Sequence, residues 1–434
     1  MTQNLLASLI LALFTKSALS APNVVFVLVD DVGWADFGYN TDGLSLIPTP
    51  NIDSLANQGL KLKNHYVHTT CTPSRASLMT GKYAANVGLP CAMAPGSVAG
   101  LPDGIATMPQ MLRKAGYSAH MVGKWHVGHS QWKQIPVGKG FESHVGGFMW
   151  SLESYTKMMW RDVVTPVNVD WGKYYENGTY QHFAEDRHAT VAITDEAVMR
   201  MKEHDKQKPL FLYVSYNAAH TPLQPEHEWL QKCQHLPHSW RRSYCGLVVG
   251  LDLAVKKLVD GAKQHLGEDT VFIVTSDNGG PTWFGGLNAP YRGTKFTPFE
   301  GGAKVPGFVL DMSGNYTMGD GAEMKHMMHI SDWMPTFLSW AGAKDSYKDL
   351  SLDGMDQTRA LKKGEKVRDE VLIELFTEKE SHDKTYSAGY RKGNYKFIQG
   401  NIKDPNWYSE PTVDNLQVRA KDKLEDMDIS LDNI

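Results

Sequence analysis

The sequence lacks an apolar run long enough to cross a membrane, because its one sustained run, Leu5 to Phe14, falls well short of the about 20 residues that a membrane helix needs. It also lacks an excess of charge, since the formal net charge is -4 at pH 7 over 434 residues. A nucleic-acid partner would favour a basic patch or stripe. Heptads, internal repeats and low-complexity tracts are missing as well. We therefore expect no membrane span and no nucleic-acid partner.

Cysteine is scarce, with 4 residues at positions 71, 91, 233 and 245. Cys233 and Cys245 are close in sequence and are our candidates for a disulfide, with two buried thiols as the alternative. The early apolar run is followed by Ala18-Leu19-Ser20, a small-x-small pattern that predicts a signal peptide over residues 1–20. Two N-glycosylation sequons begin at Asn177 and Asn315. Together these features predict a protein of the secretory pathway, secreted or lysosomal, where disulfides persist.

What the chain does contain is a set of β-branched and aromatic runs at residues 23–29, 211–216 and 270–276. Continuous apolar runs of this kind are typical of strands covered on both faces. Helical patterns at 187–204 and 240–265 alternate with them. The alternation predicts an α/β fold with a largely parallel sheet flanked by helices.

The chain is longer than one hydrophobic core usually supports. We expect one large domain over residues 21–342 and a small C-terminal subdomain over residues 343–434. The subdomain contains two short strand-like pieces between Tyr386 and Ile398, and from Lys403 onward the chain is polar. We expect that tail to be poorly packed.

Polar residues follow each of these three predicted strands and a fourth one at residues 118–122. They are Asp30 and Asp31, then Lys124 and His126, then His220, then Asp277 and Asn278. Ligands of open α/β sheets bind beyond the carboxyl ends of the strands. Side chains scattered over nearly 250 positions are therefore expected to meet at one rim.

Four of these residues carry hard oxygen donors in two adjacent pairs, Asp30-Asp31 and Asp277-Asn278. Ca²⁺ and Mg²⁺ prefer such ligands. An Asp-Asp pair alone is more often a solvated loop, and Asp277-Asn278-Gly279-Gly280 alone is more often an ordinary turn. Their joint occurrence after two separate buried strands favours a metal site.

The segment Cys71-Thr72-Pro73-Ser74-Arg75 is followed by small residues and Gly81. Pro73 is expected to begin a helix whose first turn carries Arg75 back toward residue 71. The string resembles the C/S-x-P-x-R signature of the type I sulfatases. A second family signature, G-Y-x-T-x-x-x-G-K-W-H, is similar to the run from Gly116 to His126, with Ser118 in place of threonine. The likeness covers Pro22 to Gly342, is greatest toward arylsulfatase B and its relatives, and implies the alkaline-phosphatase-like fold.

The resemblance implies a reaction as well. Cys71 would be oxidised by a formylglycine-generating enzyme to formylglycine, whose hydrate attacks sulfate monoesters, and whose second hydroxyl, deprotonated by His126, releases sulfate. One Ca²⁺ would be bound by Asp30, Asp31, residue 71, Asp277 and Asn278. The basic residues of the site would stabilise the negative charge that develops on the ester oxygens. Among these basic residues, Arg75 and Lys124 would hold the formylglycine, and His220 and Lys295 would contact the sulfate.

His220 is the expected acid to the leaving oxygen. Each of these residues also has a non-catalytic interpretation when it is considered alone. Lys124 and His126 would be a pair at a strand end, His220 a turn residue and Lys295 a surface lysine. The expected substrate is a sulfated carbohydrate or an aryl sulfate, as for an arylsulfatase or an N-acetylgalactosamine-4-sulfatase.

Two alternatives stay open: a phosphoesterase of the alkaline phosphatase superfamily, and an inactive secreted sulfatase-like protein. The family commonly carries an L-[YF]-D-x-x-x-D-P-x-E-like segment near its C-terminus, and this sequence ends without one. We therefore expect the C-terminal subdomain to be truncated.

Overall fold

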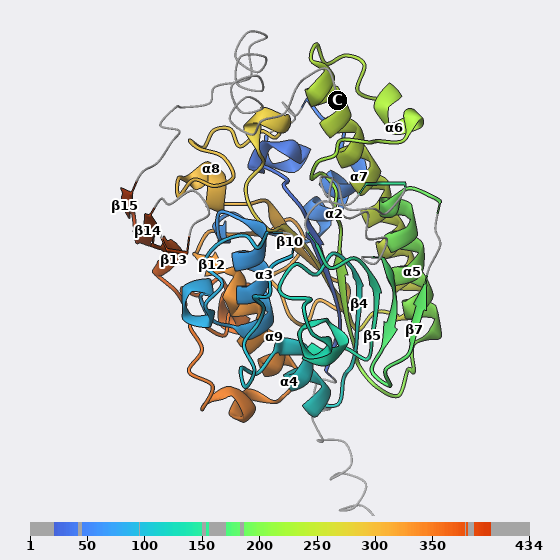
Figure 1. The fold of residues 1–434 in the computed structure, drawn as a ribbon, viewed down its shortest axis with the longest axis vertical. Helices are drawn as coiled ribbons and strands as arrows, with labels where there is room; N and C mark the ends of the chain where they lie inside the picture. Colours follow the sequence, from blue (N-terminus) through green and yellow to red (C-terminus); the bar gives the residue numbers. More distant parts are fainter. Residues whose placement is uncertain are drawn as a thin grey trace, which may run out of the picture.

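A computed structural model of the chain describes residues 21–41, 46–94, 96–149, 153–155, 171–182, 186–377, 379–380 and 386–400 (Figure 1). The predicted signal peptide over residues 1–20 and the polar tail from Lys403 lie outside the described residues. The domain boundary at 342/343 stays a prediction. Within the described part of the chain, no helix is both long and apolar enough to cross a membrane.

A ten-stranded sheet forms the centre, in the order β11-β2-β10-β9-β1-β8-β4-β5-β6-β7. Its middle is parallel and consists of β9 (Thr270–Ser276), β1 (Asn23–Val29), β8 (Leu210–Ser215), β4 (Ser118–Gly123) and β5 (Ser143–Gly146). The outer strands are β10 (Gly307–Asp311), β2 (Leu60–Leu62), β11 (Glu323–Met324), β6 (Gly172–Tyr175) and β7 (Tyr180–His182). Antiparallel pairings add β10 and β2 at one edge and β6 and β7 at the other, while β11 pairs with β2 in parallel. The α/β fold with a mostly parallel sheet is confirmed.

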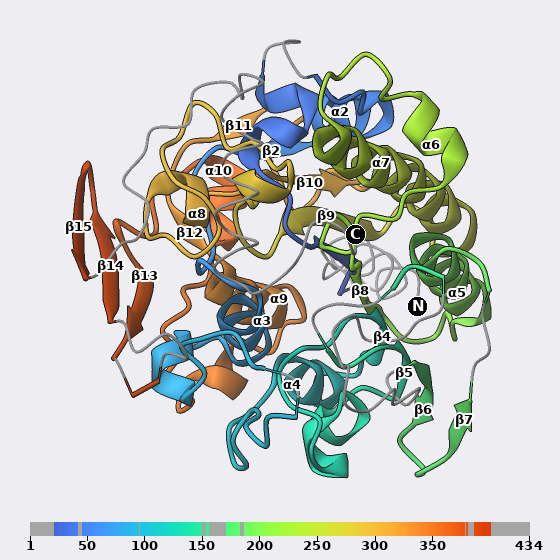
Figure 2. The same cartoon turned by 45° about the horizontal axis from the view of Figure 1, so that its top comes forward.

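Helices cover both faces of the sheet, which explains why β1 is apolar at every buried position. One face of β1, with Phe26 at its centre, packs in a core with residues of α3 (Cys71–Thr80), α4 (Met108–Lys114), α9 (Trp333–Trp340) and α10 (Thr358–Lys363). The other face, with Val27, packs with residues of α2 (Pro50–Gln58), α5 (Ala189–Glu203) and α7 (Ser239–His265). Figures 1 and 2 show α5 and α7 on one side and α3 and α9 on the other.

Cys233 and Cys245 form a disulfide with a Cα–Cα distance of 6.0 Å. It ties the chain just after α6 (His227–Gln231) to the first turns of α7. The sequence prediction of a bridge is confirmed, and the alternative of two buried thiols is wrong.

A small antiparallel sheet follows the main domain and consists of β13 (Glu370–Phe376), β14 (Ser387–Lys392) and β15 (Tyr395–Gly400) (Figure 2). β14 and β15 are the two strand-like pieces expected from the sequence. β13 was not expected, because glutamates interrupt its apolar run. One of them, Glu374, is buried and accepts hydrogen bonds from the hydroxyls of Thr69 and Ser387. Shorter elements complete the fold, namely the strand pair β3 (His65–Tyr66) and β12 (Met328–His329), and helix α8 (Glu300–Ala303).

Candidate active site

The predicted polar residues lie beyond the carboxyl ends of four adjacent parallel strands. In spatial order these strands are β9, β1, β8 and β4. They lead respectively into Asp277 and Asn278, Asp30 and Asp31, the turn to His220, and Lys124 and His126. The convergence expected from the sequence therefore follows from the order of the strands.

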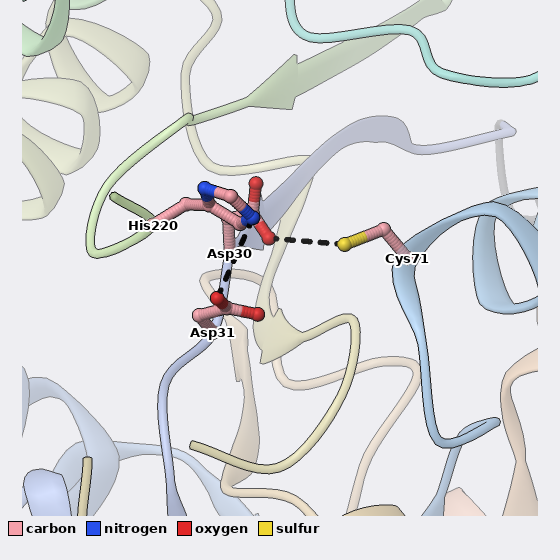
Figure 3. Close-up of side chains that lie close together, drawn as sticks. All are labelled: Asp30, Asp31, Cys71 and His220. Carbon is pink, nitrogen blue, oxygen red and sulfur yellow. Dashed lines mark hydrogen bonds and ion pairs between the residues drawn. The ribbon is translucent and has the colours of Figure 1, made fainter. Parts of the chain in front are cut away.

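Cys71 is the first residue of α3, so the helix begins two residues earlier than the expected start at Pro73. A proline is tolerated there because the N–H groups of a helix's first turn have no partner within the helix. All ten residues of α3 are buried, and Gly81, with φ of 65°, ends the helix in the left-handed conformation. The side chain of Cys71 is 2% exposed, and its Sγ lies 3.5 Å from Asp30 Oδ1 (Figure 3).

The Cys71 thiol is poorly suited to react as it stands. Burial and the negative charges of Asp277 and Asp30 raise its pKa far above the ordinary range. The thiolate is the reactive form of cysteine. At neutral pH the residue is therefore a buried, protonated thiol at the centre of a charged site.

Arg75 joins α3 to the strand ends. Its Nε and Nη2 donate to Asp277 Oδ2 at 2.9 and 2.7 Å, and its Nη1 donates to Ser215 Oγ at 2.6 Å. A further bond runs from Nη1 to the carbonyl of Lys124 at 3.1 Å. The guanidinium thus fixes the ends of β9, β8 and β4 relative to Cys71.

The two aspartates that follow β1 are held by different lysines. Lys124 Nζ donates to Asp30 Oδ2, while Lys295 Nζ lies 2.6 Å from Asp31 Oδ1. Burial by itself would raise the pKa of both carboxyls. The nearby cations outweigh burial, so the pKa of each is lowered and both are ionised at neutral pH. Lys295, which resembles a surface lysine in the sequence, is 5% exposed.

His126 presents an unused ring nitrogen. Its Nε2 lies 3.1 Å from the carbonyl oxygen of Met93, which only accepts, so the proton is assigned to Nε2. Within the described part of the chain, the buried Nδ1 has no hydrogen-bond partner. Burial and the charge of Lys124 lower the pKa of the imidazole well below its ordinary value, so the lone pair on Nδ1 is available. The residue has φ of 62°, uncommon for a side chain of this size.

His220 lies beside Asp31. Its Nδ1 donates to the Thr221 carbonyl at 2.7 Å, and its Nε2 lies 3.7 Å from Asp31 Oδ2 (Figure 3). Burial and the charge of Lys295 lower its pKa. A neutral Nε2 facing a carboxylate brings two acceptors together, an arrangement that a proton or a metal cation between them would relieve.

Possible metal ligands gather at the site. Ligand atoms of Asp30, Asp31, Cys71 and His220 all lie within 4.8 Å of one another, and all four residues are buried. Asn278 donates from Nδ2 to Asp31 Oδ1 at 2.7 Å, while its buried Oδ1 has no hydrogen-bond partner among the described residues. Buried polar atoms are nearly always paired, so an unpaired amide oxygen beside ionised carboxylates suits a bound cation such as Ca²⁺.

Sequence reasoning missed two participants. Ser215, the acceptor for Arg75, ends a strand that the sequence predicts, so the strand-end rule offered a signal for it. The carbonyl of Met93 carries no sequence signal because it is a backbone group. A third feature, the placement of His220 among the possible metal ligands, depends on the turn after β8.

The parallel sheet, with carboxylates and cations gathered beyond its strands, defines an alkaline-phosphatase-like hydrolase. The sulfatase family model matches residues 22–343, and the chain belongs to this family of sulfuric ester hydrolases. It is 33% identical over 421 residues to arylsulfatase J of Mus musculus, covering 92% of this chain and 67% of that protein. It is 31% identical over 361 residues to N-acetylgalactosamine-6-sulfatase of Homo sapiens, covering 79% of this chain and 66% of that protein. The chain thus spans about two thirds of the length of these relatives.

Solved structures agree with the family assignment. The crystal structure of Ps i-CgsB in complex with k-i-k-neocarrahexaose matches with a TM-score of 0.78 and 26% identity, over 94% of this chain and 92% of that one. The PsFucS1 sulfatase from Pseudoalteromonas sp. matches with a TM-score of 0.73 and 27% identity, over 91% and 81% of the two chains. The narrower resemblance to arylsulfatase B stays a prediction.

Proposed function

We propose that the protein hydrolyses sulfate monoesters at residue 71, after oxidation of Cys71 to formylglycine by a formylglycine-generating enzyme and with one Ca²⁺ bound nearby. The main observation in support of this proposal is the environment of Cys71. It lies at the centre of the charged site, yet it is 2% exposed, and burial raises its thiol pKa so that a thiolate is disfavoured. A site arranged around a residue that is unreactive as translated favours a modified residue at that position.

The charge balance supports an anionic ester as substrate. Three buried carboxylates, from Asp30, Asp31 and Asp277, face three buried cations, from Arg75, Lys124 and Lys295. Their charges cancel. A divalent cation bound by Asp30, Asp31, residue 71, Asp277 and Asn278 would make the site positive, which complements a singly charged sulfate monoester.

When bound, Ca²⁺ would supply polarisation of the sulfate oxygens, and the formylglycine hydrate would supply the hydroxyl nucleophile. Lys124 and Lys295 hold the aspartates and offer positive charge to the ester oxygens. His126 Nδ1, neutral and unpaired in the described structure, accepts a proton from the group at residue 71.

His220 donates a proton from Nε2 to the leaving alcohol. Its Nε2 lies beside Asp31, which favours the protonated ring, while burial and Lys295 disfavour it. Because its pKa is lowered, protonated His220 is a stronger acid but is populated mainly at acidic pH. We therefore expect turnover to increase as the pH falls below neutrality, until the aspartates themselves are protonated.

The substrate class is a sulfated carbohydrate or an aryl sulfate. The names of the relatives support both, since one is an arylsulfatase and another is an N-acetylgalactosamine-6-sulfatase. The bound neocarrahexaose of Ps i-CgsB adds a carbohydrate ligand in a structure of the same fold.

We further propose that the protein follows the secretory route, with residues 1–20 as a signal peptide, residues 21–342 as the catalytic domain and residues 343–434 as the C-terminal subdomain. The disulfide between Cys233 and Cys245 supports an oxidising compartment. The side chains of both sequon residues, Asn177 and Asn315, are exposed and therefore accessible to a glycosyltransferase.

The test combines mass spectrometry and kinetics on protein co-expressed with a formylglycine-generating enzyme. The peptide that contains residue 71 should carry the aldehyde, and the protein should hydrolyse an aryl sulfate much faster than the matched aryl phosphate. Cys71→Ala should abolish this activity, whereas Cys91→Ala, which changes the other free cysteine, should retain it. An unmodified Cys71 in active protein would refute the nucleophile, and preference for the phosphate would favour the phosphoesterase alternative.

A further inference from the structure

An exposed aromatic side chain borders the site. Phe296 follows Lys295 directly in the sequence, and 55% of its surface is exposed. Its backbone has φ of 68°, a left-handed conformation that bulky residues rarely adopt. Exposure of a large apolar ring and a strained backbone are both unfavourable for stability, and such strain is typically found at ligand-binding positions.

The backbone of Phe296 is bonded to the segment that leads into α3. Its N–H donates to the carbonyl of Thr69 at 2.9 Å, two residues before Cys71. The segment that carries Lys295 is therefore tied to the chain that leads into α3.

The ring is supported by an aromatic partner. It stacks on Trp283, with ring centroids 6.1 Å apart and an interplanar angle of 18°. Trp283 is 9% exposed and packs edge-on against Phe284, so it is anchored in the protein. The pair thus forms a flat apolar shelf with a buried base and an exposed outer ring.

The shelf adjoins the cation that faces the ester in the proposed reaction. Lys295 Nζ lies 5.5 Å from the centroid of the Phe296 ring and 2.6 Å from Asp31 Oδ1. A sulfate group near Lys295 would therefore place its organic substituent next to Phe296. A ring presents a flat face to such a shelf, while a flexible chain does not.

We propose that Phe296, supported by Trp283, is a stacking platform for the ring that bears the sulfate ester, so that the enzyme selects sulfate esters of cyclic alcohols over those of flexible chains. The inference rests on the proposed function. The recognised chemistry is a flat, partly apolar ring face, which both an aryl ring and a pyranose offer. Phe296 acts in binding and is a specificity-determining residue.

The experiment compares wild-type protein with F296G and F296Y on an aryl sulfate, a sulfated N-acetylhexosamine and a linear alkyl sulfate. Glycine suits a positive φ, so F296G should fold and keep its melting temperature, which separates binding from stability. Its KM for the ring substrates should rise about 3- to 10-fold, the range expected for one lost stacking contact, with kcat little changed. Its KM for the alkyl sulfate should change less than about 2-fold, and F296Y should resemble the wild type.

The matched control is Tyr395→Ala, which removes another exposed aromatic ring, 86% exposed on β15. It should leave all three substrates unaffected. An increase in KM for only one ring substrate supports the platform and identifies whether an aryl ring or a sugar occupies it. Equal losses on all three substrates, or a main effect on kcat, overturn the platform. A wild-type protein that hydrolyses none of the three overturns the proposed function itself.

Discussion

Arg75 donates two hydrogen bonds from one guanidinium to a single oxygen of Asp277, from Nε at 2.9 Å and from Nη2 at 2.7 Å. The two side chains are 1% and 0% exposed, so neither charge is compensated by water. The pair links α3, which begins at Cys71, to the end of β9. Its geometry is therefore relevant both to stability and to the position of residue 71.

Arg75→Ala is expected to lower the free energy of unfolding by about 3–5 kcal/mol, because it leaves the buried Asp277 carboxylate without its partner. Urea denaturation at neutral pH measures this. The matched control is Arg113→Ala, since Arg113 is 35% exposed and pairs with the half-exposed Glu176. That variant should lose less than about 1 kcal/mol. Equal losses in the two variants would contradict the buried pairing.

Addition of Ca²⁺ is expected to raise the melting temperature of the protein, and a chelator should reverse the increase. At a concentration 100 times the dissociation constant, binding to the folded state alone adds about 2.7 kcal/mol. Asn278→Ala should reduce this increment, because it removes the unpaired amide oxygen at the site. Asn86→Ala, which changes an exposed asparagine, should retain the full increment. An undiminished increment in Asn278→Ala would refute Asn278 as a ligand.

Acid is expected to destabilise the fold through buried neutral histidines. Burial lowers the pKa of His65 to about 3. Its Nε2 accepts a hydrogen bond from Trp333 Nε1 at 3.1 Å, so a proton there would set two donors against each other. A lowered folded pKa means that the unfolded chain binds more protons, so the contribution of His65 is complete above pH about 6.5 and declines as the pH falls toward about 3.

The expected slope for this residue is up to about 1.4 kcal/mol per pH unit within that window. Urea midpoints at a series of pH values measure it. His65→Gln should be less stable at neutral pH, yet it should lose stability less steeply on acidification. His227→Gln, a change at an exposed histidine, should keep the wild-type slope. An unchanged slope in His65→Gln would rule out this origin of acid sensitivity.

Glu300 connects the C-terminal sheet to the segment that carries Lys295. Its carboxylate accepts from Tyr66 at 2.6 Å and from Arg391 of β14 at 3.0 Å, and it lies 2.7 Å from Lys396 of β15. Glu300→Ala should lower the free energy of unfolding by about 1.5–3 kcal/mol, the range for hydrogen bonds to charged groups. Proteolysis within β14 and β15 should also become faster. Glu365→Ala, at a more exposed ion pair, should show neither effect.

The sequence predicted the parallel strands well because β1, β8 and β9 are buried on both faces and leave long apolar runs. It failed at β13, where Glu374 is buried but satisfied by Thr69 and Ser387, a compensation that appears only after folding. The order of strands in the sheet likewise depends on tertiary packing and has no local signal.

For the site, the strand-end rule placed Asp30, Lys124, His220 and Asp277 beside one another. It could not predict the ion pairs, because the pairing of Asp277 with Arg75 and of Asp31 with Lys295 depends on side-chain geometry. Phe296 carried no signal at all, because its positive φ is a property of the folded loop. Backbone conformation and partner choice are thus the parts that sequence patterns miss.

The complete burial of α3 has a consequence for biosynthesis. The enzyme proposed to modify Cys71 would need access to its side chain, which is 2% exposed in the folded protein. On the proposed function, oxidation of Cys71 would therefore have to precede the folding of this region. Molecules with the same sequence and nearly the same fold would then form two populations, an active one with formylglycine at residue 71 and an inactive one with cysteine there. Their ratio would depend on the relative rates of modification and folding.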